Sequence, residues 1–404
     1  MVALMLSPVY ILVNIYILRW LLKWMGACSG KLKTTWIRVT VVLIYSFFAL
    51  AILIGFLLPQ GQLRRIMKLI GNYWLGVTLY MVLTVILADI IRIILRHCRK
   101  INQEKLRSRK TFVIGGGVSI LIITAVSIGG AINARYIRTT SYDVTVEKSG
   151  GELSDLNIVL VADLHLGYNI GCAHMEQMVE KINAQNPDLV VIAGDIFDNE
   201  YEALDDPDRL ISIFQQIQSK YGVYACYGNH DIQEKILAGF TFHSDKKKES
   251  SLQMDELLEK SNITLLKDEY VLIDNSFYLY GRPDAERPNR GIEVRKTPQE
   301  ITAQLDNEKP IIVIDHEPRE LQELADAGVD LDLCGHTHDG QLFPANYTTK
   351  LMWENSYGYE KRGQMQNIVT SGVGLFGPNM RVGTIPEVCD IQVQFDGGAA
   401  SAKE

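Results

Sequence analysis

Acidic residues are nearly absent from the first third of this 404-residue sequence. Residues 1–138 contain 18 Lys and Arg but only two acidic residues, Asp89 and Glu104, whereas the remaining residues contain 22 basic and 45 acidic side chains. The two parts therefore carry charges of +16 and −23, within a net charge of −7. This division favours a basic membrane module joined to an acidic soluble one. The acidic part also argues against a nuclease, because the nucleic acid backbone is a polyanion.

Cysteine is scarce as well, and its spacing excludes two kinds of site. The six cysteines are scattered without a Cys-x-x-Cys pair, so nothing indicates a disulfide framework or a thiolate zinc site. Cys226 and Cys334 lie in apolar runs, where we expect buried, small hydrophobic side chains.

Four long apolar runs occupy the basic part. They are Val2–Leu18, Val39–Leu58, Tyr73–Ile94 and Phe112–Ile132. A helix needs roughly 20 apolar residues to cross a hydrocarbon core of ~30 Å, so residues 1–138 are predicted to form a bundle of four transmembrane helices. No basic residue precedes the first run and three more runs follow it, which argues against a cleavable signal peptide.

The charges of the connections predict how the helices are oriented. The first and third connections hold five and seven Lys and Arg, and the second holds three, so the first and third are expected in the cytoplasm. Both termini and the soluble domain would then be extracytoplasmic, in a multi-pass protein of the cell membrane. Asp89 and Arg92 share one face of the third helix, where a snorkelling ion pair is a better expectation than a transport site.

After a linker at residues 139–153, short apolar runs alternate with helical segments. The runs are Ile158–Ala162, Leu189–Ala193, Val223–Tyr227, Ile311–Ile314 and Leu331–Cys334. The helical segments are Glu176–Gln185, Asp208–Ser219, Gln253–Lys260 and Pro318–Ala327. Continuous apolar runs are typical of strands buried on both faces, so residues 154–395 are expected to form a layered α/β domain with outer helices. The small, polar tail at residues 396–404 is expected to be disordered.

Five polar clusters follow the predicted strands, and they contain five of the eight histidines. They read Asp163-Leu-His165, Gly194-Asp195-Ile-Phe-Asp198, Gly228-Asn229-His230-Asp231, Asp315-His316-Glu-Pro318 and Gly335-His336-Thr-His338. Each cluster alone is also typical of a strand cap, a helix cap or a turn. The carboxyl ends of strands meet at one edge of an open α/β sheet, however, so the clusters are predicted to form one site.

The donor types in these clusters indicate metal binding. Seven side chains are candidate ligands: Asp163, His165, Asp195, Asn229, His316, His336 and His338. Oxygen and nitrogen donors without thiolates suit Mn²⁺, Fe or Zn²⁺. Seven donors are too many for one tetrahedral zinc ion, and they fit two ions that share a carboxylate. Two such ions can clamp the attacking and leaving oxygens of a phosphoryl displacement.

The ordered set of clusters resembles the calcineurin-like metallophosphoesterase family over about residues 154–395. The flanking sequence resembles that family's membrane-associated bacterial branch and its transmembrane relatives. Gly335–Pro344 is similar to the branch's Gly-His-Thr-His-Gly-Gly-Gln segment, with Asp339 where glycine is common. Ser371-Gly-Val-Gly, Gly377-Pro, Arg381 and Pro386-Glu387 resemble its C-terminal part. The resemblance implies an α/β/β/α sandwich with hydrolase activity.

The resemblance also implies a role for each site residue. The first metal ion would be bound by Asp163, His165 and His338, and the second by Asn229, His316 and His336, with Asp195 bridging the two. The substrate phosphate would be contacted by Asn229 and His230. His230 would donate a proton or hydrogen bond, oriented by the catalytic Asp231, and Asp198 would support the loop geometry.

The sequence therefore predicts a membrane-anchored hydrolase with two divalent metal ions, with Mn²⁺ expected ahead of Fe or Zn²⁺. Hydroxide bridging the metals would attack a phosphodiester, pyrophosphate or phosphomonoester bond, and the sequence does not choose among these. A tether at the bilayer favours a lipid-linked or envelope substrate, and the resemblance includes UDP-2,3-diacylglucosamine hydrolysis among the reactions that it allows. The alternative is a non-catalytic, metal-binding receptor or scaffold on the same fold. All seven candidate ligands are present, which favours the enzyme.

Overall fold

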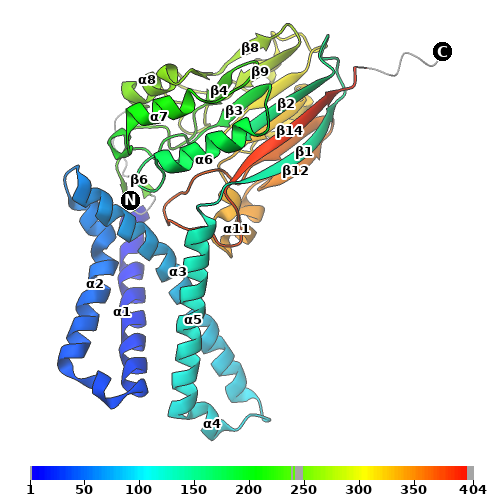
Figure 1. Ribbon diagram of the computed structural model, residues 1–404. Coiled ribbons are helices and arrows are strands. Elements are labelled where there is room, and N and C mark those ends of the chain that lie inside the picture. The colour runs from blue at the N-terminus through cyan, green and yellow to red at the C-terminus, as the bar shows by residue number, and fades with distance from the viewer. Residues whose placement is uncertain (1, 238–239, 242–248, 398–404) are drawn as a thin grey trace. The chain divides into compact units, whose positions relative to one another are not determined.

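The computed structural model describes residues 2–237, 240–241 and 249–397. The chain divides into two compact units (Figure 1). The helical unit contains residues up to Ile132 and the short segment Gly377–Met380, and the α/β unit contains most of the rest. From residue 398 on, the tail that we expected to be disordered lies outside the described residues.

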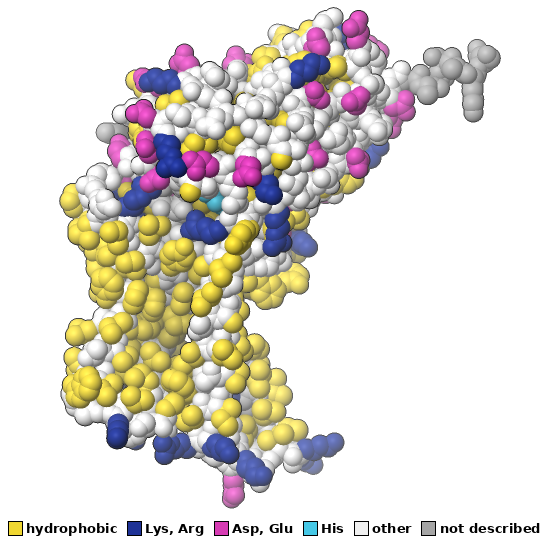
Figure 2. Space-filling view, viewed as in Figure 1, with side chains coloured by type: hydrophobic (Ala, Val, Ile, Leu, Met, Phe, Trp, Pro, Cys, Tyr) yellow, Lys and Arg dark blue, Asp and Glu magenta, His cyan; other side chains and the backbone are white. Residues whose placement is uncertain are grey.

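Four long helices form the helical unit. They are α1 (Val2–Cys28), α2 (Thr35–Leu57), α3 (Gln62–His97) and α5 (Arg109–Asn133). The short helices η1 (Gly30–Lys33) and α4 (Gln103–Arg107) lie in the first and third connections. All four long helices are long and apolar enough to cross a membrane, as the apolar runs predicted. Hydrophobic side chains cover the visible face of this unit, and Lys and Arg gather at the end that carries the first and third connections (Figure 2).

Small residues allow these helices to approach closely. A Cβ atom on Gly71 of α3 would lie 2.7 Å from Cα of Ile52 in α2, so only glycine fits at this crossing. The expected pair between Asp89 and Arg92 is not formed in the described part of the chain. Asp89 instead accepts a 2.8 Å hydrogen bond from the Tyr16 hydroxyl, because α1 brings this phenol to the carboxylate.

Two six-stranded sheets form the centre of the α/β unit. The order of the first is β1 (Arg138–Val146), β14 (Glu387–Phe395), β2 (Asp155–Val161), β3 (Leu189–Ala193), β4 (Val223–Cys226), β7 (Ile263–Leu265). The order of the second is β12 (Gly358–Arg362), β13 (Met365–Val369), β11 (Leu331–Cys334), β10 (Ile311–Ile314), β9 (Phe277–Gly281), β8 (Glu269–Ile273). A short hairpin, β5 (Ile236–Leu237) and β6 (Phe240–Thr241), stands apart from both sheets. Strands β2, β3 and β4 run parallel, as do β9, β10, β11 and β13, so their carboxyl ends reach a common edge within each sheet.

In the α/β unit, helices cover two packed sheets (Figure 1). Three clusters of buried side chains lie between the four layers. Leu160 and Val191 of the first sheet and Ile314 and Leu333 of the second lie in one core between the sheets. The outer face of the first sheet packs against α6 (Cys172–Asn183), α7 (Pro207–Phe214) and α8 (Leu252–Lys260). The second sheet is covered by α9 (Pro298–Thr302) and α10 (Leu321–Asp326). The predicted α/β/β/α class is thus confirmed.

Residues 139–153, which we expected to form a linker, contain most of strand β1. This strand pairs in parallel with β14 along nine residues, from Arg138 with Glu387 to Val146 with Phe395. It escaped the sequence prediction because only its last residues alternate between exposed and buried positions. All six cysteines are free, and Cys226 and Cys334 are buried, as predicted.

Candidate metal centre

The candidate ligands stand where parallel strands end, on backbone in an uncommon conformation. Positive φ angles occur at Asp163 (53°), His165 (46°), Asp195 (49°), His336 (71°) and His338 (51°). Non-glycine residues adopt such angles rarely, and Asp, Asn and His adopt them more readily than most. Ladder hydrogen bonds continue through these turns, since the amides of Asp163 and His165 donate to the carbonyls of Gly194 and Asp195 at 3.0 Å.

A first group of ligand atoms is formed by Asp163, His165 and His338, whose nearest donor atoms all lie within 4.8 Å of one another. Nε2 of His165 lies 3.0 Å from Nε2 of His338, which lies 3.7 Å from Oδ1 of Asp163. All three side chains are buried.

A second group is formed by Asp195, His316 and His336, joined by Asn229. Nε2 of His316, Nδ1 of His336 and Oδ1 of Asn229 lie 3.0 Å from one another. Oδ2 of Asp195 is 3.2 Å from Nε2 of His316 and 3.7 Å from Nε2 of His165. Asp195 therefore lies between the two groups, and together they contain all seven predicted ligands.

The arrangement around His316 tests whether a cation fits. Its Nδ1 lies 2.9 Å from the carbonyl oxygen of Ala193, a contact that fixes the proton on Nδ1 and leaves a lone pair on Nε2. Nε2 of His316 then lies close to three further acceptor atoms: Oδ2 of Asp195, Oδ1 of Asn229 and Nδ1 of His336. Such acceptors repel one another unless a positive charge lies among them, so these residues fit a divalent metal ion.

The pKa values show that His316 and Asp195 form a charge-coupled pair, in which a proton on Nε2 of His316 supplies the positive charge that a metal ion would otherwise supply. Burial opposes charge on His316, yet the negative charge of Asp195 raises the pKa of His316 well above its usual value. Burial would raise the pKa of Asp195, but the charge of His316 holds it well below the usual range. Burial also lowers the pKa of His336 and His338, which stay neutral, as metal-binding imidazoles must.

His230 lies beside the first group, and its surroundings correct one prediction. Its Nδ1 lies 2.5 Å from Oδ1 of Asn199 and 3.9 Å from Oδ1 of Asp198. Asp231, which we expected to orient His230, instead accepts hydrogen bonds from the amides of Phe197 (2.8 Å) and Gly228 (2.7 Å). Asp231 lies three residues after Gly228 in the same turn, so its carboxylate accepts the Gly228 N–H rather than a hydrogen bond from the His230 ring. Burial lowers the pKa of His230 to about 4.

Several residues near the ligands were not assigned a role from the sequence. Asn199 directly follows the Asp198 of a recognised cluster, and this adjacency was the available signal. The Phe376 ring lies 5.0 Å from the His230 ring and 5.8 Å from the His165 ring, between centroids. The Trp353 ring packs edge-on against His336 at 4.7 Å. Both aromatic residues are distant in sequence from every cluster, so no spacing could predict them.

Arg381 holds the loop behind Asp163. Its buried guanidinium donates to the carbonyls of Ser371 (2.7 Å), Gly374 (2.9 Å) and Gly372 (3.1 Å). Gly372 has a φ of 77°, and a Cβ atom there would lie 2.7 Å from the Asp163 side chain. The loop and the carboxylate are therefore packed too closely for any larger residue.

Comparison with known proteins agrees with the geometry. Residues 156–340 match the family described as Calcineurin-like phosphoesterase. The chain is 30% identical over 292 residues to a zebrafish (Danio rerio) "Transmembrane protein with metallophosphoesterase domain", covering 68% of this chain and 62% of that protein. It is 29% identical over 269 residues to an uncharacterized metallophosphoesterase of Campylobacter jejuni, covering 66% and 64%. An uncharacterized metallophosphoesterase of Aquifex aeolicus is 28% identical over 266 residues, covering 65% and 94%.

The chain thus spans less than two thirds of the length of the zebrafish and Campylobacter proteins. The matched residues, 156–340, include every candidate ligand from Asp163 to His338 and the strands that carry them. Residues 156–340 therefore form a calcineurin-like phosphoesterase domain.

Proposed function

We propose that this chain is a membrane-anchored phosphoesterase that binds two divalent metal ions and hydrolyses a phosphate ester or pyrophosphate bond. The observation that carries the proposal is the convergence of two ligand groups on either side of Asp195. The family match supports phosphoester hydrolysis in general. The four apolar helices support the membrane anchor.

Each ion has its own set of ligands in this proposal. The first ion is bound by Asp163, His165 and His338, and the second by Asn229, His316 and His336. Asp195 would serve both ions, because its carboxylate is the one that approaches a histidine of each group. Mn²⁺ is the proposed metal, with Fe and Zn²⁺ as alternatives that suit the same donors.

Two divalent cations at this position would acidify a bound water and offset the charge of a phosphate group. The protein's own part is to position the substrate and supply a proton. His230 is the proposed partner of the phosphate. Its Nδ1 contact with Asn199 leaves Nε2 for the phosphate, whose negative charge would raise the pKa of His230 and favour a proton on Nε2. Asn229 contacts the phosphate beside it, held by Arg287, whose guanidinium donates to the Asn229 carbonyl at 2.7 Å.

The tether suggests where the substrate is found. Helices that cross the bilayer hold the domain within reach of lipid headgroups, so we propose a lipid-linked or envelope substrate. The basic first and third connections favour a cytoplasmic position for that end of the bundle and an extracytoplasmic position for the domain.

Hydrolysis by the full-length protein in detergent would test the proposal. The protein is stripped with a chelator, reloaded with Mn²⁺ and assayed on an aryl phosphodiester and an aryl phosphomonoester. We expect metal-dependent turnover that His336→Ala reduces by at least about 100-fold. The matched control is His97→Ala, which removes a histidine of α3 that lies outside the site.

Metal content separates the remaining outcomes. Asp195→Asn should lower the content of both ions, because this carboxylate serves both groups. If the protein binds two ions but hydrolyses neither ester, its substrate specificity must be too narrow for the aryl esters to act as substrates. Neither turnover nor bound metal would favour the non-catalytic scaffold instead.

A further inference from the structure

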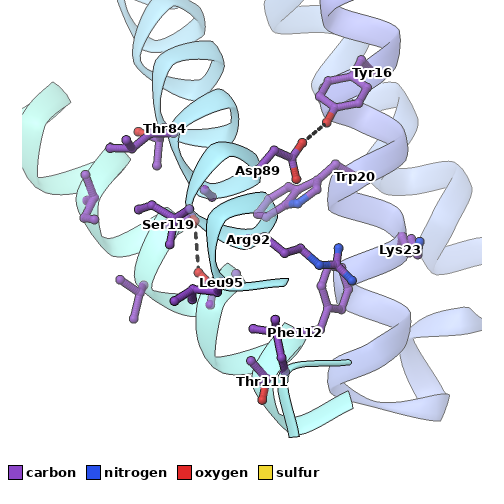
Figure 3. A pocket seen from close by; sticks show the side chains of 18 of the residues that line it. Tyr16, Trp20, Lys23, Thr84, Asp89, Arg92, Leu95, Thr111, Phe112 and Ser119 are labelled. Carbon is purple, nitrogen blue, oxygen red and sulfur yellow. Dashed lines mark hydrogen bonds between the residues drawn. The ribbon is translucent and has the colours of Figure 1, made fainter. Parts of the chain in front are cut away.

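Two adjoining cavities open at the basic end of the helical unit. The first, of about 610 Å³, lies among α1, α3 and α5 (Figure 3). The second, of about 720 Å³, lies where α1 turns through η1 into α2 and meets the start of α5. Arg19 and Lys23 of α1 line both cavities, so they form a shared wall.

The second cavity is strongly cationic. Its lining includes five basic residues and no acidic one: Arg19, Lys23, Lys33, Arg38 and Arg109. None of the five forms an ion pair with a carboxylate among residues 2–237, 240–241 and 249–397. Arg109 is held by carbonyls, since its Nε donates to Ala27 at 2.6 Å. Five unneutralised cations around one cavity fit an anion that carries at least one phosphate charge.

The first cavity is apolar along most of its length. Leu87 and Ile91 of α3 and Val118 and Ile122 of α5 line it, and these side chains are 45–56% exposed. They belong to helices long and apolar enough to cross a bilayer, so this cavity opens toward hydrocarbon. Its one acidic residue, Asp89, is already engaged by the Tyr16 hydroxyl (Figure 3). Arg19, Lys23 and Arg92 also line this cavity, so its positive charges outnumber the single carboxylate.

Two contacts of Trp24 hold α1 against α5 beside the cavities. Nε1 of Trp24 donates to the carbonyl of Val113 at 3.0 Å, and a Cβ atom on Gly116 would lie 2.1 Å from the indole. The Trp24 ring thus fills the space left by a glycine, and it fixes α1 against α5. A cavity with fixed walls needs little reorganisation to receive a ligand.

The geometry points to a binding site for an acidic phospholipid. The phosphate headgroup would lie in the cationic cavity, past Arg19 and Lys23, and an acyl chain would lie in the apolar cavity against α3 and α5. Basic pockets at the ends of transmembrane helices are suited to such headgroups. Every residue that lines the two cavities belongs to the helical unit, and none of the candidate metal ligands is among them, so we assign the site to a membrane lipid and not to the substrate.

Native mass spectrometry of the delipidated, full-length protein tests this site. The protein is titrated with an equimolar mixture of phosphatidylglycerol and phosphatidylcholine of the same chain length. We expect at least about tenfold preference for phosphatidylglycerol, and loss of that preference in the double variant Arg19→Gln/Lys23→Gln. The charge-preserving exchange Arg19→Lys/Lys23→Arg should retain it. Arg99→Gln/Lys100→Gln, which removes two exposed cations outside both cavities, is the matched control.

Two further measurements separate the lipid from other occupants. Ile122→Trp narrows the apolar cavity and should weaken phosphatidylglycerol binding while the cations remain. Millimolar glycerol phosphate should not displace the lipid, because it lacks an acyl chain. Equal binding of both lipids, unchanged preference in Arg19→Gln/Lys23→Gln, or full displacement by glycerol phosphate would each overturn the assignment. The helix content of every variant, measured by circular dichroism, checks that it is folded.

Discussion

Replacing Arg381 by lysine should destabilise the protein and loosen its metal site, although the charge is kept. Burial lowers the pKa of Arg381 to about 10, so the guanidinium is still protonated at neutral pH. It donates to the carbonyls of Ser371, Gly372, Gly374 and Ile385, at 2.7–3.1 Å. These carbonyls surround the planar guanidinium group, whose N–H groups point in several directions, and a lysine ammonium cannot reach all of them.

The size of the effect follows from the number of donors. With the carbonyl of His338 at 3.4 Å, the guanidinium donates to five carbonyls. A lysine has three N–H donors at one point, so at least two of these carbonyls would lose their partner. Each unsatisfied buried group costs about 1–3 kcal/mol, which predicts a loss of about 2–6 kcal/mol in the free energy of unfolding. The loop that packs against Asp163 would also shift, and we expect the metal affinity to fall by about 10–100-fold.

Two measurements on Arg381→Lys would check this reasoning. Denaturant unfolding of the full-length protein gives the stability, and elemental analysis after dialysis against limiting Mn²⁺ gives the metal retained. Arg209→Lys, at an exposed position of α7 with a partner in Glu176, should change neither. The reasoning is refuted if Arg381→Lys unfolds at the wild-type denaturant concentration and retains the wild-type metal content.

Three further predictions concern buried or tightly packed residues. Arg282→Met should lower the unfolding free energy by about 3–5 kcal/mol, because Arg282 is fully buried and lies 2.6 Å from the buried carboxylate of Asp315. A loss below about 1 kcal/mol would contradict this. Burial lowers the pKa of His174 to about 4 in the folded protein, whereas a histidine of the unfolded chain has a pKa near 6.5. Between these values the unfolded chain binds more protons, so the free energy of unfolding should fall by up to about 3 kcal/mol as the pH drops from about 7 to 4. His174→Gln should make the acid side of a pH–stability curve shallower, and an unchanged slope would exclude this histidine as its source. Gly116→Leu should lower the unfolding temperature of the helical unit through a clash with Trp24, worth about 1–3 kcal/mol, whereas Gly117→Leu meets open space and should be neutral.

The sequence predicted well wherever one local pattern decides the structure. Four apolar runs of sufficient length became α1, α2, α3 and α5, because no other structure satisfies their backbone in a bilayer. The polar clusters converged because each follows a buried strand, and parallel strands bring their carboxyl ends to one edge. Asp195 and His316, which lie more than 100 residues apart in the sequence, meet at 3.2 Å for this reason.

Prediction failed where a contact depends on distant segments or on side-chain reach. The neighbour of His230 is Asn199 rather than Asp231, and only the three-dimensional path of the turn decides between them. Asp89 meets a tyrosine 73 residues away in place of the arginine one turn along its own helix. Helical spacing defines which residues share a face, but it does not exclude a better partner on a neighbouring helix.

The position of β14 has a consequence for how the protein is made. Strand β1 directly follows the last membrane helix, yet its sheet neighbour is β14, near the carboxyl end of the sequence. A ribosome delivers these two strands about 240 residues apart, so β1 has no sheet partner during most of translation. The first sheet can close only after residues 387–395 emerge, which makes assembly a late event. A chain shortened by a premature stop codon before Glu387 would leave both β1 and β2 with an open edge, so such products should aggregate or be degraded.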